Sequence, residues 1–415
     1  MPNRKLFVKM IDPKKQIAEP ESRFKEHGLP ATSQAPPTFT SSNYSPTTDP
    51  RLPTTPHVPL PLPFWHGRRV LITGHTGFKG SWLAFWLKRM GADVFGYSLG
   101  VPTEPNHYEL LKLDMDSTSG DIRDLEKLSR AICDAKAEIV FHLAAQPLVR
   151  LSYEQPIDTF STNVMGTLNV FEACRQNSSV RAIINVTSDK CYENREWERA
   201  YNEDDPMGGH DPYSASKGCS ELLTKSYRNS FFNNDSYGKE HNILLASCRA
   251  GNVIGGGDWA SDRLIPDIMR SASRGIPADI RNPKSVRPWQ HVLEPLSGYL
   301  LLGQKLLEGE KSFAEAWNFG PANENSMSVE EVVKKISRFW GNIDYLISET
   351  QRNVHEAKLL KIDSSKATRK LEWFPRWDAD KTLKKTAEWY KNYYEDGVVN
   401  TEEDIKEYEE EKRAR

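Results

Sequence analysis

Short apolar runs alternate with helix-like segments between residues 69 and 251, and this order limits the fold more than any other feature of the chain. Strands are expected at 69–74, 93–99, 138–145, 180–188 and 241–251. Helices are expected at 80–91, 125–135, 161–177 and 214–231. Strands that alternate with helices predict βαβ units. The sequence therefore predicts an α/β fold with a Rossmann-type, doubly wound parallel sheet.

The segments on either side of this alternating region differ from it in composition. Of the 26 prolines, 13 lie at or before Pro63, and residues 1–62 are rich in Pro, Ser and Thr. They predict a disordered or polyproline-like tail, or alternatively a docking peptide for a proline-binding module. A dinucleotide-binding domain is expected over 63–250. A smaller substrate-binding lobe that exchanges a strand or helix with it is expected over 251–398. Residues 399–415 are read as a charged tail, either a solvated helix or a frayed end.

Charge and cysteine content exclude several classes of protein. The net charge of -2 offers no general attraction for nucleic acid. No apolar run approaches the roughly 20 residues that a membrane helix needs, and the first residues resemble neither a secretory signal nor a transit peptide. The five cysteines include no CxxC pair and no metal-ligand spacing is visible, so neither disulfides nor a metal are expected. A cytoplasmic protein is predicted.

The string GHTGFKG lies between the first strand and its helix and contains Gly74, Gly77 and Gly80. Glycines here allow a tight turn, the approach of a pyrophosphate to the backbone, and close packing of helix on strand. We therefore expect a dinucleotide site instead of a purely structural turn. The second strand ends near Ser98 without the acidic residue that would bind a ribose hydroxyl, and without an arginine, so NAD and NADP both remain open. Asp121 either contacts the adenine or caps the following helix.

Two groups of residues suggest proton transfer. Tyr213 and Lys217 are four residues apart, so on a helix they share one face, and the lysine would lower the pKa of the phenol. Such a phenol can take a proton from an alcohol. Ser188, Asp189 and Lys190 follow the strand at 180–188, where a salt-bridged strand end is the simpler interpretation. Arginines in the second lobe suit a diphosphate, and the candidates are Arg249, Arg263 and Arg287.

Four strings, TGHTGFKG, HLAAQ, NVMGT and YSASK, resemble the extended short-chain dehydrogenase/reductase superfamily, and the likeness covers residues 64 to about 395. GHTGFKGSWL, TSDKCYEN and DPMGGHDPYSASKG resemble its nucleotide-sugar 4,6-dehydratases, in the branch that acts on CDP-glucose. The resemblance implies NAD as cofactor and CDP-glucose as substrate. It also implies CDP-4-keto-6-deoxyglucose as product and a homo-oligomer, either a dimer or a tetramer.

The resemblance also implies a role for each site residue. Tyr213 takes the proton of the 4-hydroxyl, Ser188 hydrogen-bonds the 4-oxygen, and Asp189 protonates the leaving 6-hydroxyl. Thr187 replaces Ser188 if the alignment slips by one. The implied cofactor contacts are Gly74, Thr76, Gly77, Phe78, Lys79, Gly80, Asp121, Ile122, Leu143, Ala144, Ala145, Tyr213 and Lys217. The implied substrate contacts are Asn252, Arg263 and Arg287, while Trp289 either stacks near the base or has a core or interface role.

Lys190 occupies the place where the broader dehydratase pattern has a glutamate, and its role has two alternatives. An ammonium is not a base, so Lys190 can remove the C5 proton only where burial and nearby cations keep its amine neutral. Alternatively, charged Lys190 stabilises the enolate and another group is the base. Two further functions also remain: an epimerase or ketoreductase of the same fold, and a non-catalytic dinucleotide-binding scaffold. The Ser188–Lys190 run disfavours the first, and the presence of both Tyr213 and Lys217 disfavours the second.

Overall fold

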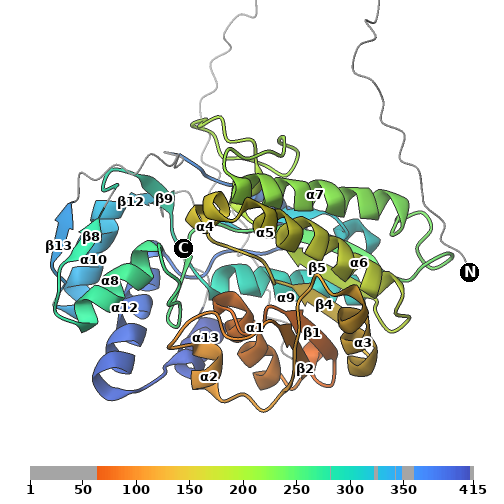
Figure 1. The fold of residues 1–415 in the computed structure, drawn as a ribbon, viewed down its shortest axis with the longest axis horizontal. Coiled ribbons are helices and arrows are strands. Elements are labelled where there is room, and N and C mark those ends of the chain that lie inside the picture. The colour runs from red at the N-terminus through yellow and green to blue at the C-terminus, as the bar shows by residue number, and fades with distance from the viewer. Residues whose placement is uncertain (1–62, 281, 322–325, 342, 348–358, 412–415) are drawn as a thin grey trace, which may run out of the picture. The chain divides into compact units, whose positions relative to one another are not determined.

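The computed structural model describes residues 63–411 apart from 281, 322–325, 342 and 348–358, so the prediction for residues 1–62 lies outside the described residues. Seven strands form one sheet in the order β11-β6-β5-β4-β1-β2-β3, and every neighbouring pair is parallel (Figure 1). The strands are β1 (Arg69–Thr73), β2 (Asp93–Ser98), β3 (Asp116–Ser119), β4 (Ile139–His142), β5 (Ala182–Val186), β6 (Leu244–Arg249) and β11 (Ala316–Asn318). The predicted α/β class with a Rossmann-type sheet is confirmed.

Helices cover both faces of this sheet because alternate strand residues point to opposite sides. In β4, Ile139 and Phe141 join one hydrophobic core, whereas Val140 joins the other. The first core includes α1 (Phe78–Arg89) and α9 (Leu293–Leu307). The second core is built with α3 (Leu125–Ala135), α6 (Gly166–Arg175) and α7 (Pro212–Ser230). Both faces are therefore buried, as the nearly continuous apolar strands require.

Two strands of the sheet carry no clear apolar signal in the sequence and were not predicted. β3 is a polar edge strand, and all of its residues are exposed. β11 lies far along the chain and is only three residues long, but it pairs with β6 and is buried. The chain thus returns to the central sheet at β11 after forming β7 to β10 (residues 253–291).

The second lobe consists of helices and three two-stranded sheets (Figure 1). Its strand pairs are β7 (Val253–Ile254) with β10 (Gln290–His291), β8 (Ala278–Ile280) with β13 (Tyr345–Ile347), and β9 (Val286–Pro288) with β12 (Ser326–Ser328). Its helices are α8 (Leu264–Ser273), α10 (Val329–Trp340), α11 (Ser365–Lys370) and α12 (Ala379–Asp396). The remaining elements are η1 (Pro63–Trp65), α2 (His107–Leu111), α4 (Val149–Glu154), α5 (Pro156–Phe160), the π-helical η2 (Ser161–Met165), η3 (Asp189–Cys191), η4 (Lys311–Phe313) and α13 (Thr401–Glu410). None of the described helices combines the length and apolar character that crossing a bilayer requires.

The helix α13 corrects the expectation of a solvated or frayed end at 399–415. It is helical, but Ile405 and Tyr408 on one of its faces are fully buried. Trp86 of α1 donates its indole N–H to Glu409 at 2.8 Å, and the Tyr408 hydroxyl donates to Glu294 of α9 at 2.8 Å. The expectation was wrong because it rested on the high charge of the whole segment, whereas most of the charges lie on one face of the helix and the apolar side chains on the other.

Candidate active site

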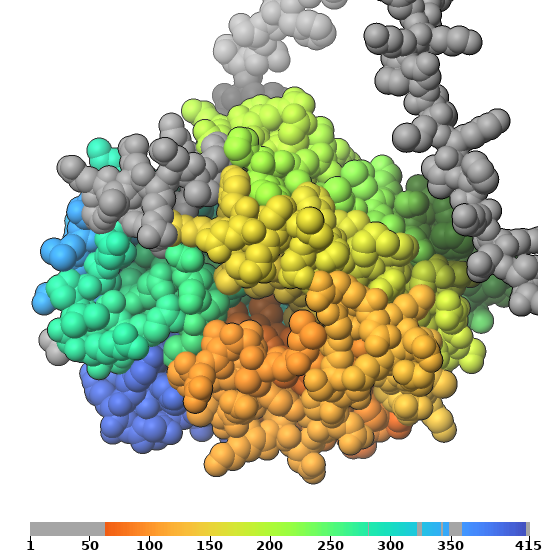
Figure 2. Space-filling view, viewed as in Figure 1, coloured from red at the N-terminus to blue at the C-terminus, as the bar shows by residue number. Residues whose placement is uncertain are grey.

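A cleft of about 790 Å³ lies beyond the carboxyl ends of the central strands, between the sheet and the second lobe. Figure 2 shows a hollow on this side of the molecule, between the segments coloured orange and yellow. Apart from Arg249, the structure brings the sequence-predicted cofactor, catalytic and substrate residues to this cleft. They are Gly74, Thr76, Gly77, Phe78, Lys79, Gly80, Asp121, Ile122, Leu143, Ala144, Ala145, Ser188, Asp189, Lys190, Tyr213, Lys217, Asn252, Arg263 and Arg287.

The glycine loop has the geometry of a phosphate cradle. Gly74 has a φ of +77°, and a Cβ there would come within 2.7 Å of the Ala144 nitrogen. A Cβ on Gly80 would come within 2.1 Å of the Gly74 oxygen, so the helix can approach the strand only without a side chain. A Cβ on Gly77 would meet nothing closer than 3.4 Å, and no side chain caps α1 after it. The loop and the N-terminus of α1 therefore fit a dinucleotide diphosphate.

Uncharged side chains form the hydrogen bonds at the end of β2. Ser98 Oγ lies 3.0 Å from His75 Nδ1, and His75 Nε2 lies 2.7 Å from Ser117 Oγ. Burial lowers the pKa of His75 to about 4, so its imidazole is neutral at neutral pH. This part of the cleft is continued by Leu99, Gly100, Val101, Pro102 and Thr103. None of these described residues offers a cation to a 2′-phosphate.

Asp121 lies at the cleft and does not cap the helix that follows it. Oδ2 of Asp121 forms an ion pair with Nη2 of Arg123 at 2.6 Å, and this interaction lowers the pKa of Asp121. The N-cap of α3 is Asp124, whose side chain accepts from the Lys127 backbone N–H. Of the two alternatives for Asp121, the helix cap is therefore wrong, and the adenine edge stays a prediction.

The Ser188–Asp189–Lys190 run begins where β5 ends and forms the turn η3. Ser188 donates its hydroxyl to Asp189 Oδ1 at 3.0 Å, and only 5% of Asp189 is exposed. A Cβ on Gly251 would lie 1.8 Å from Asp189 Oδ2, so Gly251 makes the room that this carboxylate occupies. Lys190 is exposed and lines the cleft.

Tyr213 and Lys217 lie in the first turns of α7 and are both buried. Burial raises the pKa of Tyr213 to about 12, although a hydrogen bond with Ser188 and the charge of Arg263 oppose this. Burial lowers the pKa of Lys217 to about 8, and its ammonium donates to the Val186 carbonyl oxygen at 3.4 Å. The expectation of a lowered phenol pKa is therefore wrong for the chain alone, because desolvation exceeds the attraction of nearby cations.

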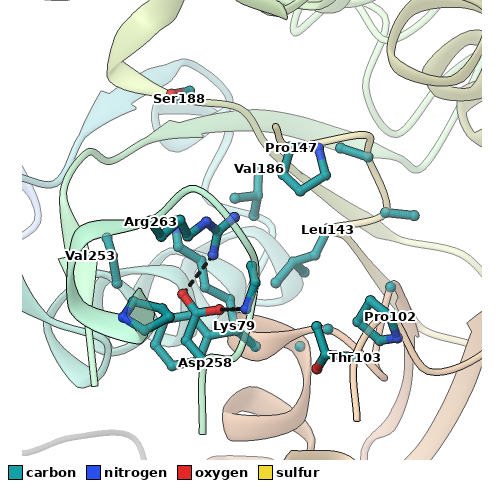
Figure 3. A pocket seen from close by; sticks show the side chains of 18 of the residues that line it. Lys79, Pro102, Thr103, Leu143, Pro147, Val186, Ser188, Val253, Asp258 and Arg263 are labelled. Atoms are coloured by element: carbon teal, nitrogen blue, oxygen red, sulfur yellow. Dashed lines mark hydrogen bonds and ion pairs between the residues drawn. The ribbon is translucent and has the colours of Figure 1, made fainter. Parts of the chain in front are cut away.

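Three cationic side chains face the middle of the cleft from different elements. Figure 3 shows Lys79, Asp258 and Arg263 near one another, with a dashed line for the 2.7 Å ion pair between Arg263 and Asp258. Burial and the charge of Arg263 lower the pKa of Lys79 to about 8. Arg287 lines the cleft from β9. These cations suit a bound anion.

Of two further candidates for substrate binding, Trp289 lines the cleft and Arg249 does not. Arg249 does not line the cleft: its side chain is 4% exposed and forms a 2.9 Å ion pair with Glu221, so the suggestion that it binds a diphosphate is wrong. Trp289 lines the cleft and also belongs to the hydrophobic core, where its indole N–H donates to the Met327 carbonyl oxygen at 3.3 Å. Both expected roles of Trp289 thus remain compatible with its position.

Sequence reasoning missed several residues that shape this site. Asn163 lies in the π-helical η2, donates to the Gln146 carbonyl oxygen at 3.0 Å and to Ser216 at 2.9 Å, and so holds the loop after β4 against α7. Gly251 has no signal in the sequence, because its role is to leave space for the carboxylate of Asp189, which is distant in the chain. The loop at 257–260 also lines the cleft. Its only signal in the sequence is the Gly- and Asp-rich string GGGDWA.

Comparison with known proteins places the chain among enzymes that modify nucleotide sugars. The sequence profile of a family described as GDP-mannose 4,6 dehydratase matches residues 71–386. The chain is 54% identical to CDP-glucose 4,6-dehydratase of Salmonella typhimurium over 349 residues, which are 83% of this chain and 97% of that protein.

Solved structures resemble the chain in fold. A dTDP-glucose 4,6-dehydratase from Bacillus anthracis, solved in complex with NAD, has a TM-score of 0.65 at 20% identity and covers 79% of this chain and 97% of its own. An epimerase from Methanothermobacter thermautotrophicus has a TM-score of 0.68 at 24% identity and covers 80% of this chain and 95% of its own.

Proposed function

Because the chain belongs to the GDP-mannose 4,6 dehydratase family, we propose that it is an NAD-dependent lyase that converts CDP-glucose to CDP-4-keto-6-deoxyglucose. The observation that carries this proposal is the meeting of two reactive groups in one cleft. Tyr213 and Lys217 come from α7, and Ser188, Asp189 and Lys190 come from the end of β5. An oxidation at C4 needs the first group, and the loss of water across C5 and C6 needs the second.

The cofactor is proposed to be NAD. The glycine loop and the uncapped start of α1 would hold its diphosphate, and Asp121 would meet the adenine. The uncharged end of β2 supports NAD over NADP, since a 2′-phosphate would meet no cationic partner among the described residues there. When bound, NAD supplies the acceptor for the C4 hydrogen and later returns that hydrogen to C6.

Tyr213 would take the proton of the sugar 4-hydroxyl in the first step. Its phenol, with a pKa of about 12, is protonated at neutral pH in this structure. Lys217 and the positive charge of the oxidised cofactor both favour the phenolate, so the base would be activated only in the loaded site. The hydrogen bond between Ser188 and Tyr213 supports a role for the Ser188 hydroxyl at the 4-oxygen.

Asp189 would protonate the 6-hydroxyl as it leaves as water. Its carboxyl is buried beside Gly251 and accepts a hydrogen bond from Ser188, which supports a defined position for the proposed acid. Exposed Lys190 would stabilise the enolate that forms when another group of the site takes the C5 proton, and a proton would add back to C5 when hydride returns to C6. Its exposure supports the second of the two roles expected for it. Asn252, Arg263 and Arg287 would bind the nucleoside diphosphate from the lobe.

The proposal is tested by incubating the protein with NAD and, separately, the CDP-, UDP-, dTDP- and GDP-linked glucoses. We expect loss of the C6 oxygen as water and a 4-keto-6-deoxy product, with CDP-glucose preferred. Asp189→Asn should lower the turnover number by about 100-fold or more, because general acid catalysis contributes that much. A matched control is Asp262→Asn, which changes an exposed carboxylate that pairs with Arg150. A product that keeps its 6-hydroxyl would instead indicate an epimerase, and cofactor binding without turnover would indicate a scaffold.

We also propose a homo-oligomer. Large apolar side chains are exposed on α5, η2 and α7: Ile157 is 85% exposed, Met165 is 51% exposed and Leu222 is 57% exposed. Apolar side chains gathered on neighbouring elements are typical of an interface. The five cysteines are all free, which supports the proposal of a reducing, cytoplasmic environment.

A further inference from the structure

A buried ion pair between Glu221 and Arg249 lies behind the reacting groups and has no part in the reaction proposed above. Oε2 of Glu221 and Nη2 of Arg249 are 2.9 Å apart, and the side chains are 2% and 4% exposed. Glu221 lies on α7 one turn after Lys217, and Arg249 is the last residue of β6. Removing two charges from water costs free energy that their attraction seldom fully recovers. The pair therefore calls for a reason other than stability.

The carboxylate of Glu221 holds the start of the segment that carries the acid. Thr187 donates its hydroxyl to Glu221 Oε1 at 2.5 Å, and Ser247 on β6 donates to Oε2 at 2.8 Å. Thr187 directly precedes Ser188. Burial alone would raise the pKa of Glu221, but Arg249 and these hydrogen bonds hold it at about 2, so the carboxylate stays charged.

The guanidinium of Arg249 holds the other end of the same segment. Nη1 donates to the Tyr192 hydroxyl at 2.7 Å, and Tyr192 in turn donates to Asn318 Oδ1 on β11 at 2.8 Å. Tyr192 directly follows η3, the turn that contains Asp189 and Lys190. Arg249 Nε has no hydrogen-bond partner among the described residues. Burying this N–H group costs free energy, which the other contacts of the guanidinium must offset.

We propose that Glu221 and Arg249 are positioning residues that fix residues 187–192 relative to α7, and that the proposed elimination depends on them. The inference rests on the function proposed above. Thr187 and Tyr192, the two ends of the segment, bind the two members of one ion pair. The helix that carries Tyr213 and Lys217 also carries Glu221, so the pair sets the place of Asp189 and Lys190 relative to the phenol. Small displacements of such groups slow a reaction strongly.

The test compares Glu221→Gln with Glu294→Gln by amide hydrogen exchange and by kinetics. Glu294 is a matched control because it is also fully buried and accepts hydrogen bonds, from the Trp377 backbone N–H and the Tyr408 hydroxyl, but lies outside the cleft. In Glu221→Gln we expect exchange of residues 187–192 to rise about 10-fold or more, since the local opening becomes easier. The turnover number should fall about 100-fold with little change in KM for CDP-glucose. Reduced cofactor should accumulate, because elimination is slowed more than oxidation. Glu294→Gln should show none of these changes.

Tyr192→Phe is a milder second variant that leaves the buried charges paired. It removes the hydroxyl between Arg249 and Asn318, and with it two hydrogen bonds, but keeps the ring, so we expect the same changes at about 10-fold. If Glu221→Gln fails to fold, Tyr192→Phe decides. Unchanged exchange at 187–192 and an unchanged turnover number in the folded variants would overturn the proposal. If the unaltered protein does not act on CDP-glucose, the proposed function fails, whereas the exchange comparison still decides whether the ion pair fixes this segment.

Discussion

The absence of a side chain at Gly251 makes room for the carboxylate of Asp189. A Cβ there would lie 1.8 Å from Oδ2 and 2.1 Å from Cγ of Asp189, well inside van der Waals contact. Ser188 then fixes the other carboxylate oxygen by its 3.0 Å hydrogen bond. The position of the proposed acid thus depends on one residue that adds no functional group of its own.

We predict that Gly251→Ala lowers the turnover number by about 100-fold while the protein stays folded, because the new methyl group forces Asp189 out of its place. Steady-state kinetics with CDP-glucose would measure this, with circular dichroism as a check on folding. Gly275→Ala is the control: its φ of +64° makes an alanine strained, but nothing lies within 4 Å of the added Cβ. A folded Gly251→Ala variant with normal turnover would remove Asp189 from the proposed mechanism.

At the scale of elements, α13 is part of the hydrophobic core and not an appendage. Ile405 and Tyr408 are fully buried, and the Tyr408 ring meets Trp86 of α1 edge-on with 5.8 Å between ring centroids. On the outer side, Arg89 pairs with Glu402 and Glu409 at 3.2 Å. Because exposed ion pairs contribute little, the apolar face is what holds the helix in place.

We predict that Ile405→Ala lowers the free energy of unfolding by about 2–5 kcal/mol, the cost of a cavity left by a buried aliphatic side chain. Lys406→Ala, one residue further along, should change it by no more than about 0.5 kcal/mol, because this side chain is exposed. Urea denaturation measures both values. Equal, small effects would mean that α13 is detached in solution and that the original expectation of a solvated helix was right.

At the scale of the whole molecule, the two lobes share one core. The cluster that contains Ile139 and Phe141 of the central sheet also contains Ile268 of α8, Ile336 of α10 and Leu383 of α12. The described residues fall in one compact unit. We therefore expect the sheet and the lobe to unfold together, so that a local change of charge at one buried group alters the stability of the entire described fold.

Asp404 on α13 provides the test of this coupling. Its side chain is 4% exposed, lies 3.3 Å from Lys385, and has one oxygen without a hydrogen-bond partner among the described residues. Burial raises the pKa of Asp404 from 3.8 to about 7, although Lys385 opposes this. The folded chain therefore keeps a proton that the unfolded chain releases above pH 3.8, so stability from this group falls as the pH rises from 3.8 to about 7.

We predict that Asp404→Asn removes this decline. Relative to the variant, the unaltered protein should lose up to about 4 kcal/mol of unfolding free energy between these pH values, since one pKa unit corresponds to about 1.4 kcal/mol. Thermal unfolding at a series of pH values measures the difference. It should appear as a shift of one transition that is seen equally by tryptophan fluorescence and by circular dichroism. Parallel pH profiles for the two proteins, or a shift in only one of two transitions, would contradict the prediction.

The sequence by itself determined the alternating sheet, the glycine loop and the residues of the proposed site, because these depend on local patterns. Apolar periodicity marks buried strands and helices, and the glycine string GHTGFKG marks the tight turn between a strand and its helix. Since parallel strands place their carboxyl ends at one edge of the sheet, residues from Gly74 to Lys217 could be expected to gather there.

Only the tertiary structure decided the features that arise between distant segments. The buried state of α13, the return of β11 to β6, the contact of Gly251 with Asp189 and the pairing of Arg249 with Glu221 all join residues far apart in the chain. The same holds for Tyr213, whose pKa rises because surrounding segments remove water from it. Burial and electrostatic environment are properties of packing, and no local pattern of residue types specifies which distant groups will supply them.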